Sequence, residues 1–139
     1  MTASISTTAA RRAIRHLALV AERAEDILAA LGRDGGSKFE MATKSDLELF
    51  LPAALAASGK PVFEGEAATP VARDAAEEAV RFMHTRRRGL ARLGAPAEMD
   101  LAAAVTVPGG GTVTLAEWLV AWDVHTSGLL GVASETAAD

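Results

Sequence analysis

The stretch VTLAEWLVAWDVHTSGLLG, residues 113–131, carries the strongest helix signal in the chain. Thr114 and Glu117 form a capping-box pattern, in which the threonine hydroxyl accepts from the N3 amide and the glutamate reaches back to the cap. Apolar and aromatic residues then recur at spacings of three and four, and Gly131 is suited to end the helix. The stretch therefore predicts an amphipathic helix over 114–131 with an apolar stripe that includes Trp118, Trp122 and His125.

Three earlier segments show the same helical periodicity. They cover residues 8–31, 45–58 and 70–93. A Gly-Gly pair after Asp34 predicts a loop between the first two, and Ser45 with Glu48 predicts a capping box that starts the second. Pro52 lies inside that helix, where it removes one hydrogen bond and predicts a kink or a split. For the third helix, we expect Thr69 as the N-cap and Pro70 at the first position.

Residues 95–112 predict the longest irregular stretch. Val105, Thr106 and Val107 are β-branched and are followed by Pro-Gly-Gly-Gly at 108–111, which favours a short extended piece and a tight turn. No Lys-Ser/Thr follows the glycines, so this segment does not read as a phosphate-binding loop.

Length and composition indicate one helical domain over residues 1–139. The chain has 139 residues, of which 50% are hydrophobic and only 4% aromatic, and alanine is abundant. This composition favours closely packed helices over a β-sandwich, which needs more β-branched and aromatic side chains. We therefore predict an all-α fold, an up-and-down four-helix bundle.

Charge and residue usage exclude several classes of function. The net charge is −4, from 14 basic and 18 acidic residues, which argues against general nucleic-acid binding. Cysteine is absent, so disulfides and thiolate metal sites are excluded. The apolar runs are too short to cross a bilayer, so no membrane association is expected. The Arg- and Ser/Thr-rich N-terminal segment reads better as a first helix than as a targeting peptide, and we expect a cytoplasmic protein.

The three histidines, His16, His84 and His125, are expected on the first, third and fourth helices. None has another ligand at i+3 or i+4, the spacing that makes a helical metal site recognisable. His125 follows the apolar stripe beside Trp122, which predicts a buried, hydrogen-bonded histidine. His16 and His84 are expected at the surface or its boundary.

Two other polar features bear on a site. Arg86 falls on the apolar stripe of the third helix, so it is expected to face the core or a groove and to need a carboxylate or an anion there. Asp123 and His125 are two residues apart and lie on different faces of their helix, so they do not form a ready-made pair. Arg87 and Arg88 are expected on a solvated helix end.

Residues 75–130 resemble the DinB/YfiT-like superfamily of four-helix bundles. The likeness is carried by an arginine-rich helix that ends in Leu-Gly, a loop with Pro-Gly, and TVTLAEWL at 112–119 before a helix with an aspartate and a histidine. The resemblance implies a divalent metal held by three histidines, one from the second helix and two from a His-x-x-x-His on the fourth. It also implies a metal-dependent hydrolase or a thiol-dependent transferase.

The chain departs from this pattern at the ligands. If Asp123 matches the family aspartate, Trp122 and Thr126 stand at the two histidine positions, and Phe50 or Leu51 stands where the second helix would supply the third. A register that makes His125 the second ligand puts Ala121 at the first. Because indole and apolar side chains cannot ligate a metal, we expect a degenerate metal site.

The leading hypothesis is therefore a DinB-like protein that binds a small molecule without a metal or other cofactor, or acts in a stress response, as a homodimer. The expected ligand pocket is lined by Phe50, Arg86, Trp118, Trp122, His125 and Thr126. The alternative is a hydrolase or transferase that builds an atypical zinc or nickel site from His16, His84 and His125. A helical interaction module without an internal pocket is the third class.

Overall fold

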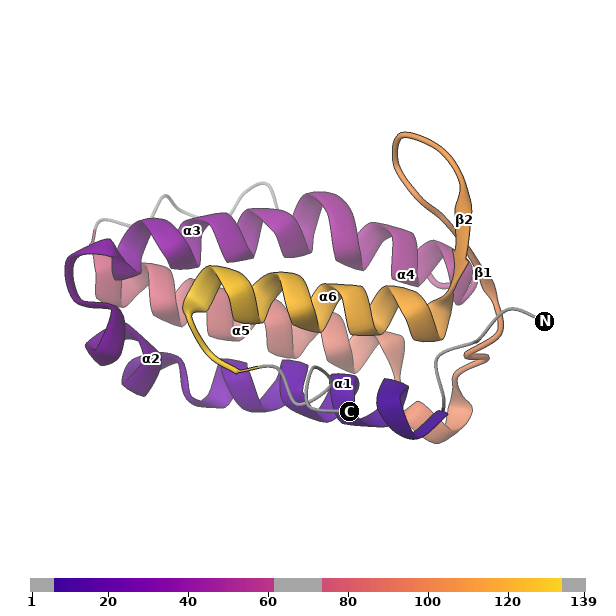
Figure 1. The fold of residues 1–139 in the computed structure, drawn as a ribbon, viewed down its shortest axis with the longest axis horizontal. Helices are drawn as coiled ribbons and strands as arrows, with labels where there is room; N and C mark the ends of the chain where they lie inside the picture. The colour runs from indigo at the N-terminus through magenta and orange to yellow at the C-terminus, as the bar shows by residue number, and fades with distance from the viewer. Residues whose placement is uncertain (1–6, 62–73, 134–139) are drawn as a thin grey trace.

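The computed structural model describes residues 7–61 and 74–133, which form four helical rods and one small hairpin (Figure 1). The rods are α1 (Thr7–Glu22) with α2 (Ala24–Leu31); α3 (Gly35–Ser45), a π turn (Asp46–Phe50) and α4 (Leu51–Ala57); α5 (Ala75–Leu93); and α6 (Leu115–Leu130). The predicted all-α class is confirmed. None of the helices described here combines the length and the apolarity that a bilayer crossing demands.

The first rod agrees with the helix predicted over 8–31, except that Arg23, whose φ and ψ are not helical, separates α1 from α2. It ends at Gly32, whose φ of 64° is costly for any residue with a Cβ. A 3₁₀ turn (Gly32–Asp34) then leads directly into α3.

The start predicted for the second helix at Ser45 is wrong. The helix begins at Gly35, so the loop predicted at 34–36 is replaced by a short turn, and Ser45 has helical φ and ψ and caps nothing. Phe39, Ala42 and Thr43 are buried at helical spacing, and this burial extends the helix ten residues before the capping-box pattern. The Ser45 hydroxyl instead bonds His125 Nε2 at 3.1 Å.

Pro52 neither breaks nor splits this rod. It occupies the second position of α4, the helix that begins directly after the π turn. A proline inside a helix lacks its N–H and presses on the carbonyl four residues earlier, which is Glu48. The wider π turn over Asp46–Phe50 relieves this clash, and the rod continues (Figure 1).

The third helix begins at Ala75, where the Asp74 carboxylate accepts from the Glu77 amide at 2.9 Å. The predicted cap at Thr69 and Pro70 lies outside the described residues.

The hairpin of β1 (Ala104–Thr106) and β2 (Thr112–Thr114) confirms the predicted extended piece and turn. Its tip, Gly109 to Gly111, has positive φ at all three glycines. The capping box of α6 at Thr114 and its left-handed cap at Gly131 are both confirmed.

The chain direction differs from the predicted up-and-down bundle. Gly36, at the start of α3, packs against Ala75 at the start of α5, and Pro61 accepts from Arg92 near the end of α5. The α3–α4 rod therefore runs parallel to α5, and α1 likewise runs parallel to α6 (Figure 1). An up-and-down bundle needs consecutive antiparallel helices, whereas here α4 ends at the same end of the bundle as α5.

The core lies between the rods as two clusters. The first joins Leu17, Leu51, Leu55, Leu119 and Trp122, among others, and the second surrounds Phe39, Phe82 and Leu130. α1 and α3 each pack against both α5 and α6. At Gly89 a Cβ would lie 2.4 Å from Leu51 Cδ1, so a glycine makes room there for the Leu51 side chain between α4 and α5.

The capping box predicts a pH-dependent contribution of Glu117 to stability. Hydrogen bonds from the Thr114 backbone N–H and hydroxyl, at 3.0 and 2.9 Å, hold the pKa of Glu117 below its ordinary value of 4.5. A lowered pKa stabilises the folded state above the ordinary value, and that gain is lost as the pH falls through the lowered one. Glu117→Gln should lower the free energy of unfolding at pH 7 and approach the wild type below pH 4.5, as measured by urea denaturation.

Glu48→Gln, the same change at an exposed glutamate outside the capping box, is the matched control. A Glu117→Gln deficit of equal size at pH 7 and at low pH would contradict the charge-based explanation.

Candidate functional site

Arg86 of α5 lies at the centre of the bundle and is completely buried. Its Nε donates to Asp46 Oδ2 at 2.8 Å, and its Nη2 donates to Asp46 Oδ1 at 2.9 Å. Asp46, at the start of the π turn, is also completely buried. The expected carboxylate partner of Arg86 is thus present, in the two-pronged geometry that suits a guanidinium best.

The remaining polar groups at this centre come from the other two rods. Arg86 Nη1 donates to the Leu17 carbonyl at 3.1 Å, and Nη2 also donates to Thr126 Oγ1 at 3.0 Å. Trp122 Nε1 donates to Asp46 Oδ1 at 2.7 Å. The guanidinium lies 4.7 Å from the centroid of the Phe82 ring and 5.1 Å from that of Trp122. We call Arg86, Asp46, Trp122 and Thr126 the ionic centre.

A divalent metal does not fit the ionic centre. Both Asp46 oxygens already accept hydrogen bonds from Arg86, and Oδ1 accepts a second from Trp122. The indole N–H donates and has no lone pair for a metal, and the guanidinium carries its own positive charge. Nor do any three histidine, aspartate or glutamate side chains gather as a possible metal site anywhere in residues 7–61 and 74–133.

The six residues of the predicted pocket are found close together, but five of them are packed into the core. Arg86, Trp122, Thr126, Phe50 and Trp118 are all buried. The Phe50 ring lies 5.0 Å from that of Trp118 and 5.9 Å from that of Trp122, and Trp118 Nε1 donates to the Phe50 carbonyl at 3.0 Å. These side chains fill the space between the rods.

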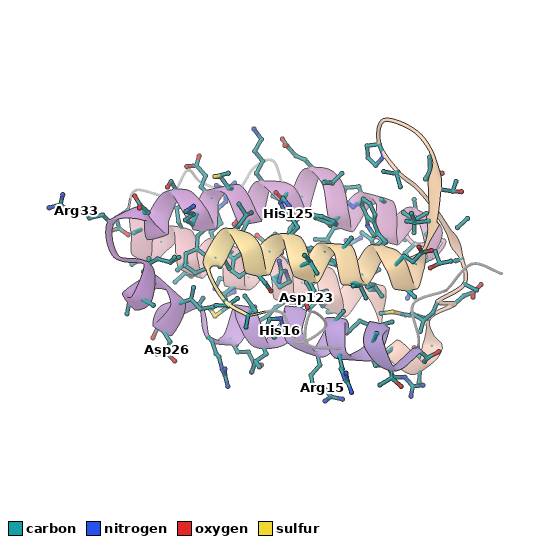
Figure 2. All side chains as sticks on the ribbon, in the orientation of Figure 1. Arg15, His16, Asp26, Arg33, Asp123 and His125 are labelled. Atoms are coloured by element: carbon teal, nitrogen blue, oxygen red, sulfur yellow. The ribbon has the colours of Figure 1, made fainter. Side chains whose placement is uncertain are left out.

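The burial predicted for the histidines is wrong at two of the three positions. His125 is exposed, next to Ser45 and 5.3 Å from the Phe50 ring centroid, whereas His16 is buried with 6% of its surface exposed. His84 is exposed, as predicted. Figure 2 shows His16 and Asp123 on the α1 side of α6, with His125 on the α3 side. The structure does not bring the three histidines together.

His16 and Asp123 form a second buried polar pair. His16 Nδ1 lies 2.5 Å from Asp123 Oδ1, and Ser127 Oγ donates weakly to the same oxygen at 3.4 Å. Asp123 is completely buried. Because Nδ1 contacts the carboxylate, the ring nitrogen left for another partner is Nε2, and the carboxylate fixes the orientation of the ring.

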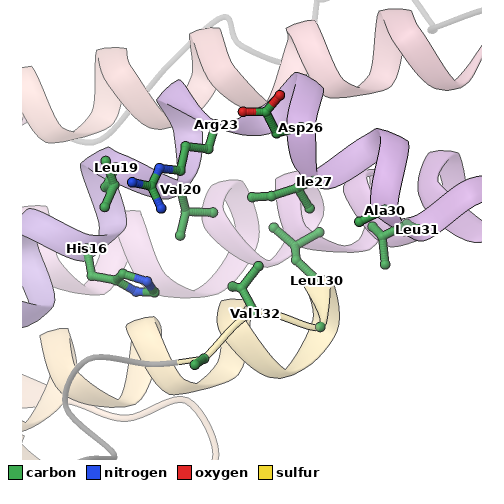
Figure 3. Close-up of a pocket in the computed structure, with 12 residues that line it drawn as sticks. His16, Leu19, Val20, Arg23, Asp26, Ile27, Ala30, Leu31, Leu130 and Val132 are labelled. Carbon is green, nitrogen blue, oxygen red and sulfur yellow. The ribbon is translucent and has the colours of Figure 1, made fainter.

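His16 also lines a groove between the α1–α2 rod and the end of α6 (Figure 3). The groove has a volume of ≈ 700 Å³. Its polar lining residues are His16, Arg23 and Asp26, and the rest of its wall is apolar. The apolar lining residues are Leu19, Val20, Ile27, Ala30, Leu31, Leu130, Gly131, Val132 and Ala133. The arrangement offers a ligand one hydrogen-bonding nitrogen, held in place by a buried carboxylate, beside a wide apolar wall.

The sequence carries a signal for this groove in the first helix. One face of the first rod holds four groove residues at spacings of three and four, namely His16, Val20, Arg23 and Ile27.

Comparison of the chain with protein-family models, with curated proteins and with solved structures finds no match. The functional reading of the groove therefore rests on its own geometry.

The ionic centre predicts a strong coupling between Arg86 and Asp46. Arg86→Met should lower the free energy of unfolding by about 3–5 kcal/mol, because it leaves a buried carboxylate without its cation. Asp46→Asn should lower the free energy of unfolding by a similar amount, because it leaves the buried guanidinium without its carboxylate. The amide oxygen of the new side chain can still accept from Trp122. The double variant should lose clearly less than the sum, as measured by urea denaturation in a double-mutant cycle.

Additive losses would mean that the two side chains do not act as a pair. Arg87→Met, on the exposed side of α5, is the matched control for the loss of an arginine.

Proposed function

We propose that this protein binds a small molecule, without a metal, in the groove beside His16. The observation that carries the proposal is the groove of ≈ 700 Å³ with a predominantly apolar wall and an oriented histidine in its lining. Small-molecule sites have volumes of roughly 300–1,000 Å³, apolar walls and a few fixed polar groups. The groove meets each of these conditions.

The metal-free part of the proposal is supported by the chemistry of the ionic centre. Its positive charge belongs to Arg86, which is covalently part of the chain and already saturates the only acidic side chain of the centre. The alternative, a hydrolase or transferase that uses zinc or nickel, would need His16, His84 and His125 to converge. Among these, His16 contacts Asp123 and His125 contacts Ser45 on opposite sides of α6.

We further propose that the chain is a divergent member of the DinB/YfiT-like superfamily. The resemblance relates Trp122 and Thr126 to two metal ligands. Trp122 donates to Asp46 of the second rod, and Thr126 accepts from Arg86, which donates to the same carboxylate. In this interpretation a guanidinium stands in for the metal charge. The expected homodimer and cytoplasmic location belong to the same proposal, and light scattering on the purified protein tests the dimer.

The metal-free proposal predicts that untagged protein carries far less than one metal ion per chain, as measured by plasma mass spectrometry. Added zinc, nickel or manganese should leave the melting temperature unchanged, because an ion that binds only the folded state would raise it. Close to one ion per chain, resistant to dialysis, would overturn the proposal.

The groove proposal predicts that a neutral apolar probe, 1-octanol, binds at the α1–α6 seam. In a ¹H–¹⁵N titration we expect shifts at Val20, Ile27 and Leu130. Ala30→Trp should abolish them, since Ala30 lines the groove and is exposed, so that an indole fills the groove without disturbing the core.

Ala29→Trp is the matched control, because Ala29 is an equally exposed neighbour that does not line the groove. Binding that survives Ala30→Trp, or that is lost in both variants, would show that the groove is not the site.

A further inference from the structure

We infer that the ligand of the groove is an apolar molecule with a single acidic group, and that the acid sits between His16 Nε2 and the guanidinium of Arg23. This inference rests on the proposed function, because it needs the groove to be a binding site. It adds the chemical class of the ligand and the position of its head group.

The first argument is that the Arg23 guanidinium and the His16 imidazole meet at one end of the groove. His16 and Arg23 are seven residues apart, about two helical turns, and thus lie on the same face of the first rod. Helical side chains lean toward the N-terminus of their helix, so a long side chain at position 23 extends back toward residue 16. Figure 3 shows the Arg23 guanidinium extending toward the His16 end of the groove.

The second argument concerns the carboxylates around this end. Asp123, on α6, is turned to the His16 Nδ1 edge and is completely buried, so it orients the ring and does not reach the groove. Asp26 lines the groove, but Figure 3 shows its carboxylate pointing away from His16. A ligand at this end therefore meets the guanidinium N–H donors of Arg23 and the Nε2 edge of His16 before it meets a carboxylate. Charge-assisted hydrogen bonds from such donors to a carboxylate are about twice as strong as neutral ones.

The third argument is the shape of the remaining surface. Beyond Arg23 the groove is lined mainly by apolar side chains, including Ile27, Leu130 and Val132, and the one charged lining residue there, Asp26, points its carboxylate away from His16. An aliphatic chain or ring can bury apolar surface there at about 25 cal/mol per Å². The groove thus separates a cationic end from an apolar end, and a monocarboxylate such as a medium-chain acid matches both.

The test compares three probes with the same eight-carbon chain, namely octanoate, 1-octanol and octylammonium, by isothermal titration calorimetry of the full-length protein at pH 7. We expect octanoate to bind about tenfold more tightly than 1-octanol, the factor of one charge-assisted contact, and octylammonium to bind most weakly. Arg23→Gln should remove most of the octanoate preference and leave 1-octanol binding unchanged. Arg23 is exposed, so this variant should fold.

Arg15→Gln is the matched control, because Arg15 is exposed on α1 but does not line the groove. His16→Gln tests the second contact, and its circular dichroism spectrum separates a folding defect from a binding defect. Equal affinity for octanoate and 1-octanol overturns the inference and leaves the proposed function standing. Tighter binding of octylammonium also overturns it, whereas no binding of any probe contradicts the proposed function itself.

Discussion

The bundle depends on one buried ion pair, Arg86 with Asp46. Removing two charges from water costs several kcal/mol per ion, and only a well-formed pair with further hydrogen bonds offsets that cost. Here the additional partners come from every other rod: Leu17 from α1, and Thr126 and Trp122 from α6. Because each bond has a narrow range of distance and angle, the pair fixes the rods in one relative position.

The π turn carries Asp46 and Phe50 at its two ends, and both residues are buried. Because they are four positions apart, they share one face of a rod that also accommodates Pro52. Phe50 then packs on both tryptophans and accepts from Trp118 through its carbonyl. Pro52, which predicts a helix break from the sequence alone, is thus found next to the π turn that carries Asp46 of the ionic centre.

The sequence predicted those features that local chemistry determines. The capping box at Thr114, the glycine hairpin, the all-α class and the need of Arg86 for a carboxylate all follow from a few neighbouring residues. It failed where distant contacts decide: Ser45 has the right neighbours for a cap, but burial of Phe39 and Ala42 extends the helix past it. The partner of Arg86 and the parallel direction of α3 and α5 depend on which rods meet, and periodicity within one rod does not encode that.

His16 is buried and His125 is exposed, the reverse of what the sequence predicts, because of how α6 packs in the bundle. A helix with one buried face would bury Trp118, Trp122 and His125 together, as the apolar stripe predicts. α6 instead packs against α3 on one side and α1 on the other, so Trp122 and Thr126 face the ionic centre while Asp123 and Ser127 face α1. His125 lies at the exposed edge of the α3 side, where it bonds Ser45. The ionic centre is filled by an indole and a guanidinium, and the groove proposed as the ligand site lies at the α1–α6 seam, next to His16 and its partner Asp123.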